Sequence, residues 1–459
     1  MIQKNTIYGL STLYGKSAIA IIKISGPKSL KVLKSLNFKN KLIERKAILG
    51  KVYTKNLDLL DEIIVIYFCK NNSYTGEDVV ELQTHGGIAI VNSIFNELRS
   101  LNYLRVANNG EFTKVALENN KITLNKAESL IELINAETEC QRKVSVRNYN
   151  GNLEESYSLW RSSMIKLLSI SEAYIDFPDY LISNIILQKL NLRIRQLRDE
   201  FENNIKLFAF ANKLMNGVNL CIAGPTNVGK STLMNFLSQS DASIISNIQG
   251  TTRDIIKSKL DILGVPVILH DTAGIRNTSD YIENIGIKKG KEAIKNADIL
   301  IIMLEASSAI DFSILAQFKS YRKPDSKVLI LINKVDLFKE FQSLKIYLNL
   351  YLSKINFKFE KILLSCLNKN HSKKKILNFI KKLIENFIPI SGATLVTNVR
   401  HQEKLKKSAY YLNEAANNKA LELKAQELRY AAEEIGFILG DINFEEVLNK
   451  IFSTFCVGK

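Results

Sequence analysis

Residues 224–231 read Gly-Pro-Thr-Asn-Val-Gly-Lys-Ser, and this stretch decides the fold of the central part of the chain. It follows the apolar run Val218–Ala223 and precedes the helical pattern Thr232–Leu237. A G-x4-G-K-S sequence between a strand and a helix is a phosphate-binding loop, because its glycines let backbone N–H groups surround the phosphates. We therefore expect Lys230 to reach the β- and γ-phosphates and Ser231 to ligate Mg²⁺.

Two further motifs each follow an apolar run: Asp271-Thr-Ala-Gly274 and Asn333-Lys-Val-Asp336. Asp271 is expected to hold the Mg²⁺ shell through water, and the Gly274 N–H to contact the γ-phosphate. An Asp carboxylate in the second motif accepts two hydrogen bonds from guanine N1–H and N2–H₂, a donor pair that adenine lacks. Ser365-Cys366, after the next apolar run, is expected in the last base-contacting loop. Motifs at the ends of successive strands predict a GTP-binding parallel sheet wrapped by helices.

The residue after Gly274 bears on how GTP would be cleaved. Ras-like GTPases place a Gln there to orient the attacking water, whereas this chain has Ile275, whose aliphatic side chain cannot do so. Glu283 is the nearest carboxylate candidate, and the alternative is that it is an exposed carboxylate on a helix surface. Asn227 either binds a monovalent cation beside the phosphates or is present for its turn conformation. Thr252 is the candidate switch threonine that completes Mg²⁺ coordination.

The 459 residues indicate several domains. Short apolar runs with Gly-bearing turns predict an α+β domain over residues 1–121. Apolar residues at helical spacing predict helices over 122–214, with a break at Asp176-Phe-Pro-Asp179. The GTP-binding segment spans 215–378, and residues 379–459 are again helical. Because the α/β segment lies between two helical segments, we expect it to be an insertion into one helical domain.

The net charge of +17 and the pI near 9.4 are typical of a protein with a polyanionic partner such as RNA. The excess of Lys, Asn and Ile is also what an AT-rich genome produces, so charge alone leaves both explanations open. The five cysteines form no CxxC pair, which favours reduced thiols in a cytosolic protein. No apolar run reaches 18 residues and the N-terminus lacks a signal-peptide core, so we expect a cytoplasmic protein without a membrane span.

Several sequences outside the GTP-binding segment point to a known family. They are Ser73-Tyr-Thr-Gly-Glu-Asp78, His85-Gly-Gly87, Gly110-Glu-Phe112, Ile175-Asp-Phe-Pro178 and Phe455-Cys-Val-Gly-Lys459. With them, the chain resembles the MnmE (TrmE) family of tRNA modification GTPases along its whole length. The resemblance implies an N-terminal folate-binding α+β domain, an α-helical domain made of two chain segments, and an inserted α/β P-loop GTPase domain.

The resemblance also implies an activity and partners. The chain would form a homodimer through its N-terminal domain and a heterotetramer with the FAD-dependent partner MnmG. Together they would add an aminomethyl-type group (carboxymethylaminomethyl) to C5 of the wobble uridine of certain tRNAs. A tetrahydrofolate would donate the one-carbon unit, and K⁺-stimulated GTP hydrolysis would drive the conformational cycle. FAD would be bound only by the partner.

The family's functional residues carry over to matching positions of this chain, and its catalytic glutamate aligns with Glu283. The implied GTP contacts are Asn227, Val228, Gly229, Lys230, Ser231, Thr232, Ser246, Asn247, Ile248, Gln249, Gly250, Thr251, Thr252, Asp271, Thr272, Ala273, Gly274, Asn333, Lys334, Val335, Asp336, Ser365 and Cys366. The implied Mg²⁺ ligands are Ser231 and Thr252, and the implied K⁺ ligands are Asn227, Ser246, Ile248 and Thr251. The implied folate contacts are Lys23, Glu81, Lys121 and Lys459.

The chain departs from the family pattern at several positions. The glycine-rich N-terminal stretch is here Leu13-Tyr-Gly-Lys-Ser-Ala-Ile-Ala20, and the usual arginine is Lys23, which lacks the bidentate fork. Thr226 takes the place of the family's Pro in the phosphate loop, and the Ala expected after Ser365 is absent. Cys456 has two interpretations: a role near the one-carbon chemistry, or ordering of the C-terminal tail.

Two other functions compete with this hypothesis. A ribosome-assembly GTPase would explain the basic charge and the GTP-binding motifs, but not the N-terminal motifs or the Phe455–Lys459 tail. A nucleotide-gated scaffold that has lost the folate chemistry would explain the altered N-terminal stretch.

Overall fold

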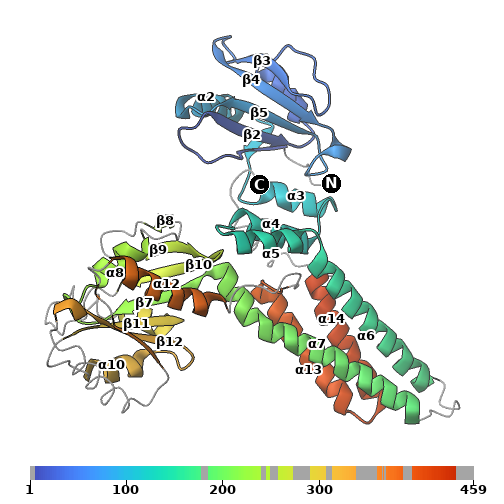
Figure 1. Ribbon diagram of the computed structural model, residues 1–459. Coiled ribbons are helices and arrows are strands. Elements are labelled where there is room, and N and C mark those ends of the chain that lie inside the picture. Colours follow the sequence, from blue (N-terminus) through green and yellow to red (C-terminus); the bar gives the residue numbers. More distant parts are fainter. Residues whose placement is uncertain are drawn as a thin grey trace. The chain divides into compact units, whose positions relative to one another are not determined.

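The computed structural model describes residues 6–176, 184–238, 244–248, 257–271, 290–306, 313–337, 359–363, 365, 369–385 and 395–440. The chain divides into two compact units, each assembled from segments far apart in the sequence (Figure 1). The first unit comprises Met1–Ile134, Asn148–Arg195 and Tyr410–Lys459, and the second comprises Asn135–Arg147 and Gln196–Ala409. The domain limits expected from the sequence stay predictions.

The first unit begins with a six-stranded sheet in the order β3-β4-β5-β2-β1-β6. Only β1 and β6 pair in parallel among these described strands. One face packs beneath helices α1 and α2 around Ile24, Val65 and Leu82, because alternate residues of each strand point to the same side. The elements are β1 (Thr6–Leu10), β2 (Ile19–Ser25), α1 (Ser29–Ser35), β3 (Ile48–Tyr53), β4 (Leu59–Phe68), η1 (Lys70–Asn72), β5 (Val79–His85), α2 (Ile88–Arg99), β6 (Leu104–Val106) and α3 (Glu111–Glu118).

The opposite face of this sheet is partly open. Leu49, Ile64, Gln83 and Ile21 pair in one row across β3, β4, β5 and β2. Leu49 is 59% exposed, and the other three side chains are half-buried. The sheet therefore has a second face with apolar character that helices α1 and α2 do not cover.

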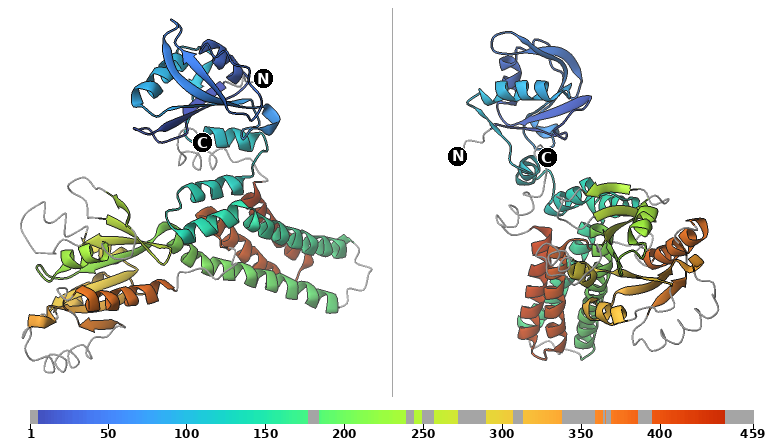
Figure 2. Two further views of the ribbon diagram at one scale, coloured as in Figure 1. Left: turned by 45° about the horizontal axis from the view of Figure 1, so that its top comes forward. Right: turned by 90° about the vertical axis from the view of Figure 1, so that its left-hand side faces the viewer.

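Helices from distant parts of the sequence pair within the first unit. Helix α6 (Asn152–Asp176) and helix α14 (Leu421–Leu439) lie side by side (Figures 1 and 2). Arg429 on α14 donates a hydrogen bond of 2.8 Å to Glu172 on α6. The predicted pairing of the two helical segments is thus confirmed, and α6 ends at Asp176, where the sequence predicts a break. Helix α4 (Leu124–Ile134) also lies in the first unit, whereas three further helices are each divided between the two units: α5 (Glu139–Tyr149), α7 (Asn184–Asn216) and α13 (Val399–Asn417).

The second unit contains a seven-stranded sheet in the order β13-β12-β11-β7-β10-β9-β8. Its first five strands are parallel, whereas β9 pairs antiparallel with both β10 and β8. Helices α8 and α12 cover one face and α10 the other, so β11 and β12 are almost continuously apolar. The elements are β7 (Val218–Ala223), α8 (Lys230–Ser238), β8 (Ile244–Ile248), β9 (Lys257–Ile262), β10 (Val265–Asp271), β11 (Ile299–Glu305), α10 (Ser313–Tyr321), β12 (Lys327–Asn333), η2 (Val335–Leu337), β13 (Glu360–Leu363) and α12 (Lys369–Glu385).

Helix α12 continues the GTP-binding fold beyond the expected domain limit at 378. Ile376, Ile380 and Ile384 all lie in the core formed with β7, β11 and β12. The apolar face of α12 is therefore buried both before and after residue 378, the domain limit predicted from the sequence.

Truncation of a side chain in this core tests its contribution to stability. Leu331 on β12 is 0% exposed, so Leu331→Ala should lower the free energy of unfolding by about 2–5 kcal/mol, because a cavity remains. Leu207 on α7 is 44% exposed, and Leu207→Ala should change it by less than about 0.5 kcal/mol. Urea unfolding measures both, and equal losses in the two variants would contradict this assignment of the core.

Candidate nucleotide-binding site

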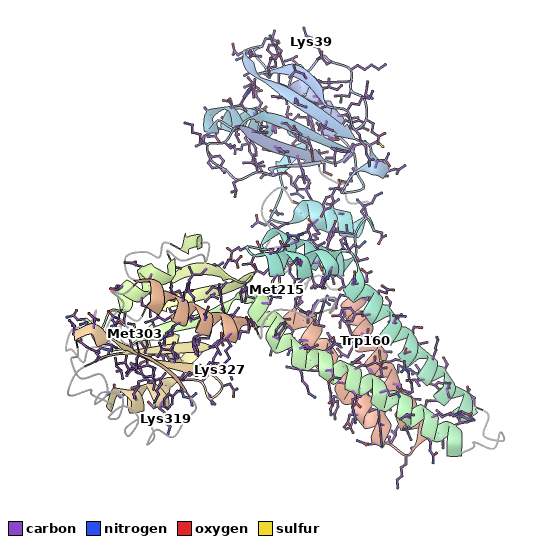
Figure 3. The ribbon with its side chains drawn as sticks, viewed as in Figure 1. Lys39, Trp160, Met215, Met303, Lys319 and Lys327 are labelled. Atoms are coloured by element: carbon purple, nitrogen blue, oxygen red, sulfur yellow. The ribbon has the colours of Figure 1, made fainter. Side chains whose placement is uncertain are left out.

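The phosphate loop between β7 and α8 contains three residues at positive φ: Gly224 (152°), Asn227 (61°) and Gly229 (101°). A Cβ at Gly224 would collide with the carbonyl oxygen of Met303 on β11, the strand beside β7 (Met303 is marked in Figure 3). A Cβ at Gly229 would lie 2.5 Å from Nδ2 of Asn333. Glycine is required at both positions because neighbouring strands approach the loop closely.

A hydrogen bond joins the base-contacting motif, Asn333–Asp336, to this loop. Asn333 is 2% exposed, and its Nδ2 donates to the Val228 carbonyl oxygen at 2.7 Å. Lys334 follows with φ of 60°, and its Nζ lies 2.9 Å from Oε2 of Glu305. Asp336 is exposed in η2, where its carboxylate is accessible to a base. The phosphate end and the base end thus belong to one site.

The ammonium group of Lys230 lies inside the loop. Lys230 is 7% exposed, and its Nζ donates to the carbonyl oxygens of Gly224 and Pro225 at 2.9 and 2.6 Å. This is where the phosphate-loop sequence predicts the charge that meets the phosphates. A buried ammonium is costly unless its donors are satisfied, and the two carbonyls satisfy two of the three.

Of the two predicted Mg²⁺ ligands, the structure describes Ser231, at the start of α8, and Asp271, predicted to act through water, ends β10, the strand beside β7. Ser231 and Thr232 are exposed in the first turn of α8, whose N-terminus favours anions. Asp271 ends β10 and is paired in register with Ile222, one residue before the end of β7. A hydroxyl and a carboxylate are the oxygen donors that Mg²⁺ prefers, so the donor set fits this ion.

The remaining residues predicted for this site fall into two groups, one on β8 and one outside the described part of the chain. Ser246, Asn247 and Ile248 lie on β8, which pairs with β9. Asn227 has the left-handed backbone that its turn interpretation requires, and a ligand role for its side chain stays a prediction. The predicted residues outside the described part of the chain are Gln249, Gly250, Thr251, Thr252, Thr272, Ala273, Gly274, Glu283, Cys366, Cys456 and Lys459.

The candidate folate residues are partly brought together in the N-terminal sheet. Lys23 on β2 and Glu81 on β5 face each other in register, with Lys23 Nζ 3.6 Å from Glu81 Oε1. Lys121 donates from Nζ to the Asn71 carbonyl oxygen at 2.8 Å. A Cβ at Gly76 would lie 3.2 Å from Cε of Lys121, so Lys121 packs against the motif of residues 73–78.

That motif forms a hydrogen-bonded corner at one end of the sheet. Ser25 Oγ lies 2.7 Å from Thr75 Oγ1 and 3.1 Å from Oε2 of Glu77. Tyr67 donates to Asp78 at 2.9 Å, and burial together with this carboxylate raises the pKa of Tyr67 to about 12. The raised pKa extends to more alkaline pH the range in which the phenol stays protonated and donates to Asp78.

The His85-Gly-Gly87 motif is explained by packing at the other end of β5. His85 donates its backbone N–H to Asp61 at 2.9 Å, and its Nδ1 lies 2.7 Å from the same carboxylate. A Cβ at Gly86 would collide with Ser17. The motif thus holds Ser17 and Ala18, near the end of the altered N-terminal stretch, against the end of β5.

Two residues of the nucleotide site carry no recognisable sequence signal. The Met303 carbonyl leaves no room for a side chain at position 224, and the Glu305 carboxylate forms an ion pair with Lys334. Both lie on β11, whose apolar sequence indicates only burial. Their contribution arises because β11 lies between β7 and β12 in the sheet.

A glycine-dependent phosphate loop with a buried lysine, joined to an Asn-Lys-x-Asp base motif, defines a P-loop GTPase. Residues 6–121 match the family model described as GTP-binding protein TrmE N-terminus, and residues 124–456 match the one described as MnmE helical domain. The tRNA modification GTPase MnmE of Rickettsia akari is 41% identical over 99% of this chain and 100% of its own length. That of Rickettsia bellii is 39% identical over the same shares.

The chain therefore belongs to the tRNA modification GTPase MnmE (TrmE) family. It is a GTPase that acts in tRNA modification, as the sequence predicts. A solved structure of Aquifex aeolicus Era, 20% identical, matches 48% of this chain and 89% of its own with a TM-score of 0.30, a likeness too distant to carry an argument. No helix within the described ranges is long and apolar enough to cross a membrane.

A methyl group at Gly229 tests the close approach of Asn333. Gly229→Ala should weaken GTP binding at least about 100-fold, because both the positive φ and the clash oppose the native loop. Gly151 has a similar φ of 97° with open space around it among the described residues, so Gly151→Ala is the matched control and should bind GTP normally. Titration with a fluorescent GTP analogue measures both; normal binding by Gly229→Ala would refute the geometry.

Proposed function

We propose that this chain acts with the FAD-dependent partner MnmG to add a carboxymethylaminomethyl-type group to C5 of the wobble uridine of certain tRNAs. The observation that carries the proposal is the match of residues 6–121 and 124–456 to the two family models, together with about 40% identity over the full length of the relatives. A tetrahydrofolate derivative supplies the one-carbon unit when it is bound.

The Lys23–Glu81 pair supports a folate-binding role for the N-terminal sheet. The ammonium is a donor to carbonyl and carboxylate groups of a ligand, and the carboxylate accepts from ring N–H and amino groups. The two side chains are only 28% and 19% exposed, so a ligand between them would be partly shielded from water. Lys121 and Lys459 complete the proposed set.

The open face of the N-terminal sheet supports a homodimer through this domain. The row Leu49–Ile64–Gln83–Ile21 lies beside the row that contains the Lys23–Glu81 pair. An apolar face next to a ligand site is typical of an interface that both partners share. The heterotetramer with MnmG is built on this dimer in our proposal.

GTP hydrolysis is proposed to depend on groups that replace the Ras-like glutamine. Lys230 and the loop N–H groups bind and orient the phosphates, while Ser231 and Thr252 would hold Mg²⁺, which neutralises phosphate charge. A potassium ion held by Asn227, Ser246, Ile248 and Thr251 would supply the charge that an arginine supplies elsewhere. Glu283 would then orient the attacking water.

The dependence on potassium is directly measurable. The GTPase rate should be higher in K⁺ than in Na⁺, and Asn227→Ala should abolish that difference while retaining basal hydrolysis. Glu283→Ala should lower the rate in both salts by about 10²–10³-fold, since the water loses its orienting group. Equal rates of the unaltered chain in K⁺ and Na⁺ would count against the ion, and an unchanged rate in Glu283→Ala would count against the glutamate.

The modification itself is tested by mass analysis of wobble uridines in cells that lack the protein. Such cells should accumulate unmodified wobble uridine, and the unaltered gene should restore the modified nucleoside. Lys23→Ala should fail to restore it. Lys51→Ala is the matched control, since Lys51 faces Glu62 in register on the neighbouring strand pair of the same sheet.

The outcomes separate the competing functions. Identical nucleosides in cells with and without the protein would reject the modification and favour a ribosome-assembly GTPase. Loss of modification without the protein, but full rescue by Lys23→Ala together with no binding of 5-formyltetrahydrofolate to the intact chain, would favour the nucleotide-gated scaffold.

A further inference from the structure

Five lysines follow one another closely in the N-terminal domain of the first unit. Residues 26–43 contain five lysines and no Asp or Glu. All five side chains are exposed. We call this set the lysine stripe; it consists of Lys28, Lys31, Lys34, Lys39 and Lys41.

The fold places the first three lysines of the stripe along α1 and the last two along the edge strand β3. Helix α1 buries Val32 and Leu33 against the sheet, which turns Lys28, Lys31 and Lys34 outward at a spacing of three residues. The chain then follows the sheet edge, because Tyr53 on β3 donates its N–H to the Leu36 carbonyl at 2.9 Å. Asn40 donates from Nδ2 to the Leu49 carbonyl of the same strand at 2.6 Å.

Lys39 and Lys41 flank Asn40 and thus lie along the edge strand β3. Lys39 lies at the surface in Figure 3. The stripe accordingly extends from α1 onto the edge of the sheet, and Leu36, between its third and fourth lysines, anchors the segment in the core.

An aromatic ring, and not a carboxylate, holds the first two lysines of the stripe in place. The Tyr103 ring lies under two ammonium groups, with its centroid 5.7 Å from Lys28 Nζ and 4.8 Å from Lys31 Nζ. The Tyr103 hydroxyl is 3.0 Å from Ser35 Oγ on α1, which fixes the ring. A ring holds a cation while leaving its full charge available to an anion, and it lowers the entropy lost on binding.

Some lysines elsewhere in the described chain are paired with carboxylates. Lys213, Lys259 and Lys334 each pair with a carboxylate at 2.7–2.9 Å. No carboxylate pairs with any lysine of the stripe among the described residues. Base composition explains segments rich in lysine and free of acidic residues, such as residues 361–384, but it does not explain the placement of Lys28 and Lys31 over one aromatic ring.

The stripe and the proposed folate residues belong to the same folded domain, although α1 covers the face of the sheet opposite to Lys23 and Glu81. Helix α1 starts four residues after Ser25, whose hydroxyl bonds Thr75 and Glu77 in the corner against which Lys121 packs. A polyanion on the stripe would be held on the same folded domain as Lys23 and Glu81. Resting on the function proposed above, we propose that the lysine stripe binds the phosphate backbone of the tRNA substrate and so holds the tRNA on the domain that carries the proposed one-carbon site.

The salt dependence of RNA binding tests this role. The probe is an unmodified tRNA transcript with uridine at the wobble position, titrated with the full-length chain at several salt concentrations. Each phosphate contact contributes about 0.7–0.9 to the slope of log K against log salt. The variant K28Q/K31Q/K34Q should therefore flatten the slope by about 2, whereas K28R/K31R/K34R, which keeps the charges, should retain the original slope.

A matched control removes the same charge elsewhere. Lys374, Lys375 and Lys381 lie on α12 of the second unit, and K374Q/K375Q/K381Q should leave the slope unchanged. All variants should keep the unfolding midpoint and basal GTPase rate of the unaltered chain, because none of these lysines belongs to the nucleotide site or the core.

Three results would overturn the proposal. They are a slope unchanged in K28Q/K31Q/K34Q, an equal flattening in the α12 control, or no tRNA binding by the unaltered chain. The first would leave the stripe as a surface for an acidic protein. The measurement needs no folate, GTP hydrolysis or partner, so failure of the one-carbon chemistry would leave its result readable.

Discussion

The nucleotide site depends on the buried hydrogen bond from Asn333 Nδ2 to the Val228 carbonyl. It joins the end of β12 to the loop after β7, although β11 lies between those strands. The loop must therefore pass across the end of β11, where the Met303 carbonyl leaves no room for a side chain at 224. Gly224, Gly229 and Asn333 therefore act together with the strand order, because all of them are needed for the loop to lie this close to β11 and β12.

The N-terminal sheet divides its two faces between folding and binding. One face is closed by α1 and α2 around fully buried residues such as Ile24 and Leu82. The other keeps Leu49 exposed and presents the Lys23–Glu81 pair in the adjoining row. Because side chains alternate along each strand, the same strands can build a core and present a ligand or partner surface. That division suits a domain proposed to dimerise and to bind folate.

The charge of this chain is used in two distinct ways. In the second unit, lysines such as Lys213 and Lys259 are satisfied by carboxylates and contribute to local structure. In the lysine stripe, the ammonium groups are held by a ring and by the course of the backbone, so their charge remains directed outward. The net charge of +17 counts both kinds alike, although an ammonium group without a carboxylate partner attracts a polyanion more strongly than a paired one.

The sequence by itself determined the class of the protein, because backbone chemistry at the phosphates demands Gly224, Gly229 and Lys230 at fixed spacing. It also determined the strand–helix alternation, since buried parallel strands must be apolar throughout. It did not show that Met303 and Glu305 serve the site, or that α12 continues past residue 378 as part of the GTP-binding fold. Tertiary structure decided those points, because strand order and the pairing of side chains depend on contacts between residues far apart in the chain.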